Sequence, residues 1–509
     1  MRKTFFLIIP ICYAIFFAAC SSPLPQQYNV VLDTVAIYPD YTDLVIPYNI
    51  APLNFKMNDD DLKHIVVNYK SAEYSFTLRG KNKINIPIKK WRKLLGKNID
   101  GKVAVEVYAK KAKEKEWILY PTFYYEVSAD AVDKYLAYRL IDPGFDIWVM
   151  MGLYQRNVEN FEERALITNA FTKRNCINCH TFNQNSPDEM VFHMRQDYGA
   201  TYVFTQGKYD KLDTKTDYTL SNCVYPYWHP SGRYIAFSTN KTQQALHSRP
   251  DLMIEVYDQK SDVVVLDVEK KELFTTPLVH SGQTMDTYPV FSADGKRLFF
   301  CRTHETDSVH IPYKEIRYNL CAIDFDATTS SFGSTVDTLI YAQETGKSIT
   351  FAHPSFDGKY ILLAMSDYGC FPSWNSESDL YLYDLSTSEL KSLDELNSEY
   401  AEGYNTWSSN SKWIVFSSRR SDQLYNRPYF SHIDERGNCS KPFILPQKDP
   451  LFYTSFLKAY NKPELVKSKI PTNPRKILKA AKQEQMEVVF RPDGFSFEKQ
   501  QEQKGTPVN

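Results

Sequence analysis

A hairpin-like segment that recurs four times in the second half of the chain constrains the fold more than any other feature of the sequence. Each copy has a short strand, a tight turn and then a strongly apolar strand. In the first three copies a Ser-Gly or Asp-Gly turn accepts the positive φ angles that a hairpin requires. A second pair of strands follows the hairpins, so each repeat of about 50 to 65 residues predicts a four-stranded β-propeller blade. The copies are Tyr225–Ser238, Tyr288–Phe300, His353–Leu363 and Tyr404–Ser417.

The turn sequence resembles that of the TolB-like family of β-propellers, in which Ser-x-Asp-Gly-Lys follows an aromatic residue, as in Phe291–Lys296. The resemblance covers about Val224 to Pro446, and it implies a propeller over residues 201–461. TolB-like propellers commonly have six blades, whereas the sequence has four clear hairpins, so five and six blades are both open. The remaining strands are expected from Tyr202–Leu220 and from the region after Phe452.

A separate β unit is predicted ahead of the repeats, over residues 28–130. Runs such as Leu44–Ile50 and Val103–Tyr108 alternate or are continuously apolar, and turn residues separate them. This pattern indicates a small β-sandwich. Lys89–Leu95 is expected to form a helical turn within it.

Residues 131–200 are expected to form a short helical segment between the two β units. Ala131–Leu140 places apolar residues at helical spacing, and Phe145–Tyr154 and Ser186–Gln196 are expected to be further short helices. Residues 462–509 are interpreted as a polar C-terminal extension. The predicted fold class is therefore mainly β, with a C-terminal TolB-like propeller preceded by a sandwich and a helical segment.

The N-terminus has the pattern of an exported, lipid-anchored protein. A basic start and a short apolar run end in Ala18-Ala19-Cys20, which resembles the lipobox of bacterial lipoproteins. The resemblance implies a signal peptide over residues 1–19, lipidation of Cys20 and a tether over residues 20–27. A periplasm-facing position on the outer membrane is expected, with the cell surface as the alternative. An ordinary signal peptide with a chance cysteine is the other interpretation.

Charge and cysteine content exclude two classes of protein. Sixty basic and 61 acidic side chains leave no net positive charge, so the chain is not expected to bind nucleic acid. Beyond Cys12 and Cys20, seven scattered cysteines remain, and an odd, scattered set is not a disulfide framework.

Only one cysteine pair has a meaningful spacing, Cys176-Ile177-Asn178-Cys179-His180. It resembles the attachment motif of c-type cytochromes, which implies one covalent haem c held by Cys176 and Cys179, with His180 as an iron ligand. A disulfide-forming pair and a zinc site remain as alternatives. Zinc would need further ligands, and only His193 lies near in the sequence.

The second axial ligand of the iron is expected among residues shortly after the motif. If residues 186–196 form a helix, Met190 and Met194 share one face at i and i+4, with His193 beside them. Met190 and Met194 are the predicted ligands. Packing of both side chains in a core is the competing explanation.

These patterns predict an envelope lipoprotein that transfers electrons through one haem to or from a protein partner docked on the propeller. The alternative is a TolB-like interaction scaffold of the outer membrane in which the cysteine pair or the haem is structural. An enzyme that uses the haem iron, such as a peroxidase, is a third possibility, but no acid–base pair stands out for it. No Gly-x-Ser-x-Gly elbow is present, so an electron carrier or scaffold is favoured over an enzyme.

Overall fold

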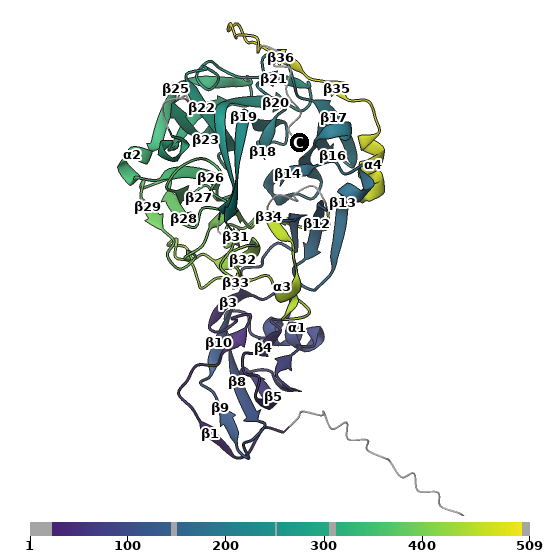
Figure 1. Cartoon of the computed structure of the whole chain (residues 1–509), viewed down its shortest axis with the longest axis vertical. Helices are drawn as coiled ribbons and strands as arrows, with labels where there is room; N and C mark the ends of the chain where they lie inside the picture. Colours follow the sequence, from purple (N-terminus) through teal and green to yellow (C-terminus); the bar gives the residue numbers. More distant parts are fainter. Residues whose placement is uncertain (1–22, 144–149, 250–251, 305–311, 501–509) are drawn as a thin grey trace, which may run out of the picture.

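The computed structural model describes residues 23–143, 150–249, 252–304 and 312–500. Over these residues the chain is mainly β, as predicted, and a small N-terminal unit lies beside a larger ring-shaped unit (Figure 1). No helix within the described ranges is long and apolar enough to cross a membrane. The predicted signal peptide and Cys20 lie outside the described residues. The α-helices of the described chain are α1 (Ile88–Gly96), α2 (Ala342–Thr345), α3 (Phe452–Ser455) and α4 (Pro474–Ala481).

The N-terminal unit packs two sheets and helix α1 around a common core. Trp91 of α1 is fully buried, meets the rings of Tyr69 and Tyr125 edge-on and donates its indole N–H to the Ile50 carbonyl. The predicted helical turn at Lys89–Leu95 is thus part of α1. The larger sheet holds β1 (Tyr28–Val30), β3 (Leu44–Pro47), β5 (Leu62–Lys70), β6 (Ser75–Gly80), β8 (Lys102–Lys111), β9 (Trp117–Leu119) and β10 (Phe123–Ser128), and the smaller holds β2 (Ile37–Tyr38), β4 (Phe55–Met57) and β7 (Lys83–Ile84).

Six sheets of four or five strands form the ring in the described part of the chain (Figure 1). Their innermost strands touch one another in a closed cycle, β34 to β14, β18, β22, β26, β30 and back to β34, so the sheets surround one central axis. This arrangement is typical of β-propeller blades. The first three sheets are β11 (Tyr135–Ile141), β12 (Gly152–Asn157), β13 (Glu163–Thr168) and β34 (Ala459–Val466); β14 (Ile177–Phe182), β15 (Glu189–Met194), β16 (Ala200–Thr205), β17 (Lys208–Asp213) and β35 (Met486–Glu487); and β18 (Val224–Trp228), β19 (Tyr234–Arg249), β20 (Leu252–Asp267), β21 (Glu272–Phe274) and β36 (Val489–Arg491).

The four repeats recognised in the sequence all form the hairpins that were predicted. Gly232, Gly295 and Gly358 at the first three turns have φ of 72° to 74°, and Ser411 at the fourth has φ of 58°. The hairpins are β18–β19 and the first two strands of the other three sheets: β22 (Thr284–Phe291), β23 (Arg297–His304), β24 (Asn319–Asp326) and β25 (Ser331–Ile340); β26 (Ser348–Pro354), β27 (Tyr360–Ser366), β28 (Asp379–Asp384) and β29 (Leu390–Ser392); and β30 (Glu402–Trp407), β31 (Trp413–Ser418), β32 (Arg427–His432) and β33 (Phe443–Ile444).

The helical segment predicted over residues 131–200 is wrong. Its described residues form strands β11 to β16 of the first two sheets, with short 3-10 turns between some of them. Strand β11 lies between β12 and β34 and carries buried residues on both faces, so it is apolar almost throughout. A continuously apolar run does not distinguish a buried strand from a helix. The propeller-like ring therefore starts near Tyr135 rather than at residue 201.

The prediction of a separate polar C-terminal extension over residues 462–509 is wrong for residues 462–500, which the structure describes. Strand β34 crosses that boundary and pairs antiparallel with β11, so the last innermost strand completes the sheet begun by the first three strands of the ring. Beyond it, α4 packs its Ile477 and Ala481 into the core between the first two sheets. Strands β35 and β36 then add to the outer edges of β17 and β21.

Candidate functional site

All six innermost strands contain the same irregularity, a β-bulge, at the same place. In β14, Asn178 pairs with His193 and Thr181 pairs with Val191, so two residues lie opposite one. The other five strands repeat this two-against-one register. The first bulge residue has φ between 48° and 53°, a conformation that residues other than glycine rarely adopt. We call these six residues the axial ring: Cys179, Tyr225, Tyr288, Phe351, Tyr404 and Lys462.

Four aromatic members of the axial ring contact one another in succession around the central axis. Ring centroids lie 4.2 Å apart for Tyr225 and Tyr288, 5.2 Å for Tyr288 and Phe351, and 4.9 Å for Phe351 and Tyr404. Cys179 and Lys462 hold the two remaining positions. The second cysteine of the Cys-x-x-Cys-His motif therefore lies on the central axis.

The two motif cysteines differ in burial. Cys176, just before β14, is 5% exposed, whereas Cys179 is partly exposed. Both are free thiols, so the disulfide alternative is not realised in this structure. Burial raises the pKa of the Cys176 thiol, an effect that the nearby Arg139 and Arg195 partly offset. A buried thiol with a raised pKa is a poor nucleophile.

His180 is the second residue of the bulge and is 2% exposed. Burial, together with the positive charges of Lys462 and Arg139, lowers the pKa of its imidazole well below the ordinary value. The ring is therefore neutral, and its Nε2 is buried without a hydrogen-bond partner. A buried, unpaired imidazole nitrogen costs free energy unless something binds it.

Met190 and Met194 do not lie on a helix, so the predicted helical spacing is wrong. Both belong to β15, where residues at even spacing share a face, and they pair across the sheet with Phe182 and Ile177. Their side chains lie with those residues in the core between the first two sheets. His193 points to the other side, where its Nδ1 lies 3.0 Å from the Thr201 hydroxyl.

The alternative of a zinc site lacks ligands. In the described residues no group of three or more His, Cys, Asp or Glu side chains is placed to hold a metal ion. His193, the one further candidate in the sequence, belongs to the opposite face of β15 and packs against Phe237. The donors that the structure does bring together are two free thiols and one neutral imidazole. This set matches the chemistry of covalent haem attachment and ligation.

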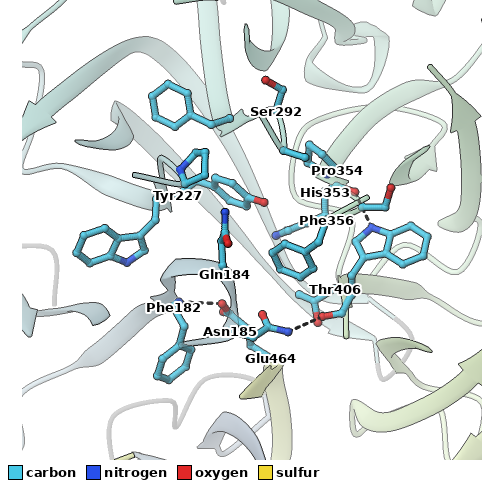
Figure 2. A pocket seen from close by; sticks show the side chains of 16 residues that line it. Phe182, Gln184, Asn185, Tyr227, Ser292, His353, Pro354, Phe356, Thr406 and Glu464 are labelled. Atoms are coloured by element: carbon cyan, nitrogen blue, oxygen red, sulfur yellow. Dashed lines mark hydrogen bonds between the residues drawn. The ribbon is translucent and has the colours of Figure 1, made fainter. Parts of the chain in front are cut away.

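A pocket opens at one end of the central axis, and we call it the axial pocket (Figure 2). Its floor is a second ring, made by residues that lie two positions after members of the axial ring. Tyr227, His353, Thr406 and Glu464 are the members that line it, and aromatic side chains such as Trp407 form its walls. The pocket was not predicted from the sequence, although the aromatic residues that form its walls recur in or just before the repeated turns.

The polar groups of the axial pocket are only partly satisfied. Glu464 Oε1 accepts hydrogen bonds from the Thr181 hydroxyl and the Phe182 N–H, at 2.8 and 2.9 Å. Its Oε2 is buried without a hydrogen bond, and the Lys462 ammonium lies 3.8 Å away. Burial raises the pKa of Glu464, and Lys462 partly offsets the rise. His353 Nδ1 lies 3.3 Å from the Phe351 carbonyl.

The long hairpin β19–β20 lies near the other end of the axis. Glu255 near its tip accepts hydrogen bonds from the hydroxyls of Tyr313 and Tyr368, which lie in connections between strands of the fourth and fifth sheets. Asp258, farther down the hairpin, accepts from Asn240 at 2.7 Å and lies 3.7 Å from the Cys370 sulfur. Burial raises the pKa of Asp258 to about 7. Glu255 and Asp258 thus join the hairpin to residues of the fourth and fifth sheets, and Asp258 is the carboxyl that burial keeps partly protonated near neutral pH.

Comparison with known proteins leaves the family open. No family model matches the sequence, and no curated protein matches it either. Solved structures with partial likeness include prolyl oligopeptidase B from Galerina marginata (9% identity, TM-score 0.33). The matched region covers 67% of this chain and 43% of the peptidase chain. The tricorn protease (13% identity, TM-score 0.28) covers 68% and 34%, and the endo-arabinase of Bacteroides thetaiotaomicron (15% identity, TM-score 0.27) covers 51% and 89%. This chain spans less than half the length of these two peptidases, and likenesses this distant carry no argument about function.

Proposed function

We propose that this protein is an electron-transfer lipoprotein that carries one covalent c-type haem on strand β14, held by Cys176, Cys179 and His180. The observation that carries the proposal is the unpartnered Nε2 of the buried, neutral His180, which follows two free thiols in the same five-residue motif. A neutral imidazole nitrogen with no hydrogen bond is free to donate its lone pair to iron. When bound, haem would supply a one-electron couple between ferric and ferrous iron.

Because the motif is buried in the folded chain, haem would have to be attached before folding is complete. Cys176 is almost fully enclosed, and its raised thiol pKa disfavours the thiolate in the folded chain. In our proposal the two thiols therefore add across the vinyl groups, each forming a C–S bond and passing its hydrogen to the vinyl carbon beyond, before β14 joins its sheet. The folded sheet then encloses the bonds.

The proposed haem carrier is a propeller held at the outer membrane. We interpret the six sheets as six blades of a TolB-like propeller, in which the closed cycle of innermost strands surrounds the haem-bearing strand. Lipidation of Cys20 would hold the protein at the outer membrane, facing the periplasm, where c-type haem is attached. A redox partner would dock on a face of the propeller.

An interaction scaffold is the second candidate, and one observation favours it. Cys176 and His180 are only 5% and 2% exposed, so the protein itself encloses both side chains. In that case the motif would pack in the folded sheet without haem.

Covalent haem is the discriminating measurement. The mature chain is expressed with a haem-attachment system, denatured and examined as the pyridine haemochrome, beside the double variant Cys176→Ala/Cys179→Ala. The variant Cys223→Ala, which removes a buried cysteine outside the motif, serves as the control. We expect one haem per chain in the wild type and the control, and none in the double variant. Absence of haem from the wild type would leave the scaffold, and a bound haem that cannot be reversibly reduced and reoxidised would rule out electron transfer.

A further inference from the structure

Hydrogen-bond acceptors lie at the floor of the axial pocket, whereas the buried donor without a partner among its lining residues, the Trp228 indole N–H, belongs to the wall. Glu464 Oε2 is an acceptor without a donor. The Nδ1 of His353 faces the Phe351 carbonyl and so carries the ring proton, which leaves Nε2 as an acceptor. Figure 2 shows His353 and Gln184 directed into the hollow, near the ring of Tyr227. A group that fills this floor has to donate hydrogen bonds.

The charge of the pocket also favours a ligand that donates hydrogen bonds. Glu464 is the only carboxylic acid among the residues that line the pocket, and its side chain is 7% exposed. The Lys462 ammonium at 3.8 Å is beyond hydrogen-bond distance, so it balances part of the charge without satisfying the oxygen. A buried carboxylate with an unsatisfied oxygen is stabilised by a cation that also donates a hydrogen bond.

The walls suit the same kind of ligand. Trp228, Phe291, Phe356 and Trp407 surround the opening, and these aromatic side chains come from four different sheets. Aromatic faces attract ammonium groups and also cover alkyl chains. Pockets with apolar walls and a few convergent polar groups are typical of sites for small ligands.

We propose that the axial pocket binds a primary alkylamine, with the ammonium group on Glu464 and His353 and the alkyl chain between the aromatic walls. The source of the amine is either a small molecule or a lysine side chain of a docked protein, since both present the same group. The pocket adjoins the motif, since Glu464 accepts a hydrogen bond from Thr181, the residue after His180, but amine binding does not depend on the proposed electron transfer.

Butylammonium and 1-butanol test the proposal because they differ in charge and donors but little in size. Binding to the mature full-length chain is measured at pH 8 by ligand-observed NMR titration, where the amine is protonated. We expect saturable binding of butylammonium and at least about tenfold weaker binding of butanol, as a charge-assisted hydrogen bond predicts. Equal affinity for the two probes would overturn the proposal.

Two variants with opposite expected effects show where the probe binds. Glu464→Gln keeps the oxygen that accepts from Thr181 and Phe182 but loses the charge, and it should weaken butylammonium binding about tenfold. Lys462→Met removes the competing ammonium and should tighten it. Glu435→Gln, at an exposed carboxylate that pairs with Lys359, is the control and should change nothing. If neither variant changes the affinity, the amine binds elsewhere and the assignment fails.

Peptides that contain lysine, with and without acetylation of its amine, distinguish a docked lysine side chain from a free amine. If a peptide containing acetylated lysine binds as well as its unmodified form, a docked lysine is excluded. If only the unmodified peptide competes with butylammonium, the pocket is a docking point for a protein partner.

Discussion

Cys179 and Tyr225 occupy the same position in neighbouring innermost strands, each as the first residue of a bulge, with φ of 53° and 52°. The second bulge residue is proline in three of the other strands, Pro226, Pro289 and Pro463, whereas in β14 it is His180. A strand can therefore make this bulge without cysteine or histidine. The residues of the motif are not needed for the shape of the strand, which supports a chemical role for them.

The unequal burial of the two motif cysteines predicts selective labelling. In the haem-free folded protein, Cys179 should react with a thiol reagent faster than any other cysteine of the described chain, because it lies partly exposed on the axis. Cys439 is also partly exposed, but burial raises the pKa of its thiol to about 12. Mass spectrometry after brief labelling checks this order. Cys179→Ser should abolish the fast phase, and fast labelling of Cys176 would contradict the burial described.

Truncation tests the closure of the ring by β34. A chain that ends at Lys458 loses the innermost strand of the first sheet and exposes the edge of β11, so it should aggregate. A chain that ends at Lys482 keeps β34 and α4 and loses only β35 and β36, and it should unfold cooperatively with a Tm lower by a few degrees. Thermal melts of both chains are the measurement. Equal behaviour of the two would show that β34 does not close the ring.

Asp258 predicts a pH-dependent loss of stability. Because burial raises the pKa of this carboxyl from 3.8 to about 7, the folded protein keeps a proton that the unfolded chain releases between those values. Stability should therefore fall as the pH rises through this window, by at most about 4 kcal/mol. Asp258→Asn should reduce the fall in stability over this window, whereas Asp367→Asn at the surface should leave it unchanged. Denaturant titrations between pH 4 and pH 8 measure the difference, and parallel curves for wild type and Asp258→Asn would refute it.

Gly295 is predicted to be irreplaceable for a steric reason that goes beyond its turn. A Cβ at this position would lie 2.2 Å from Nε2 of His229, which is held against the Gly295 carbonyl, and φ is +72°. Gly295→Ala should lower the free energy of unfolding by about 2 to 5 kcal/mol. Gly207→Ala shares the positive φ but has open space around it, and it should cost about 1 to 2 kcal/mol. Similar losses for the two variants would show that the contact with His229 relaxes freely.

The second axial ligand remains a prediction that haem-loaded protein can test. Met190→Leu and Met194→Leu keep the volume and the apolar character of the core between the first two sheets. Loss of a thioether ligand should lower the reduction potential, since methionine ligation raises it. A shift in one variant only would identify the ligand. Unchanged potentials in both would mean that the two side chains only pack in the core.

The repeats were predictable because each hairpin is a local structure. The Ser-x-Asp-Gly turns and the strands beside them lie within about fifteen residues, so period and turn chemistry are written in consecutive letters. Strand β11 was misread because a strand buried on both faces has no alternating pattern. Met190 and Met194 were misplaced for a related reason, since a spacing of four residues puts side chains on one face of a helix and of a strand alike.

The sequence by itself determined the β class, the four hairpins and the Cys-x-x-Cys-His motif, since these depend on residues close together in the chain. Only the tertiary structure decided that β34 closes the ring, that Cys179 and Lys462 belong to one ring, and that Glu464 lies on the floor of a pocket. Those relationships join residues about 280 to 330 positions apart, and six strands have to pack around one axis before they exist. Long-range packing of that kind leaves no local pattern in the sequence.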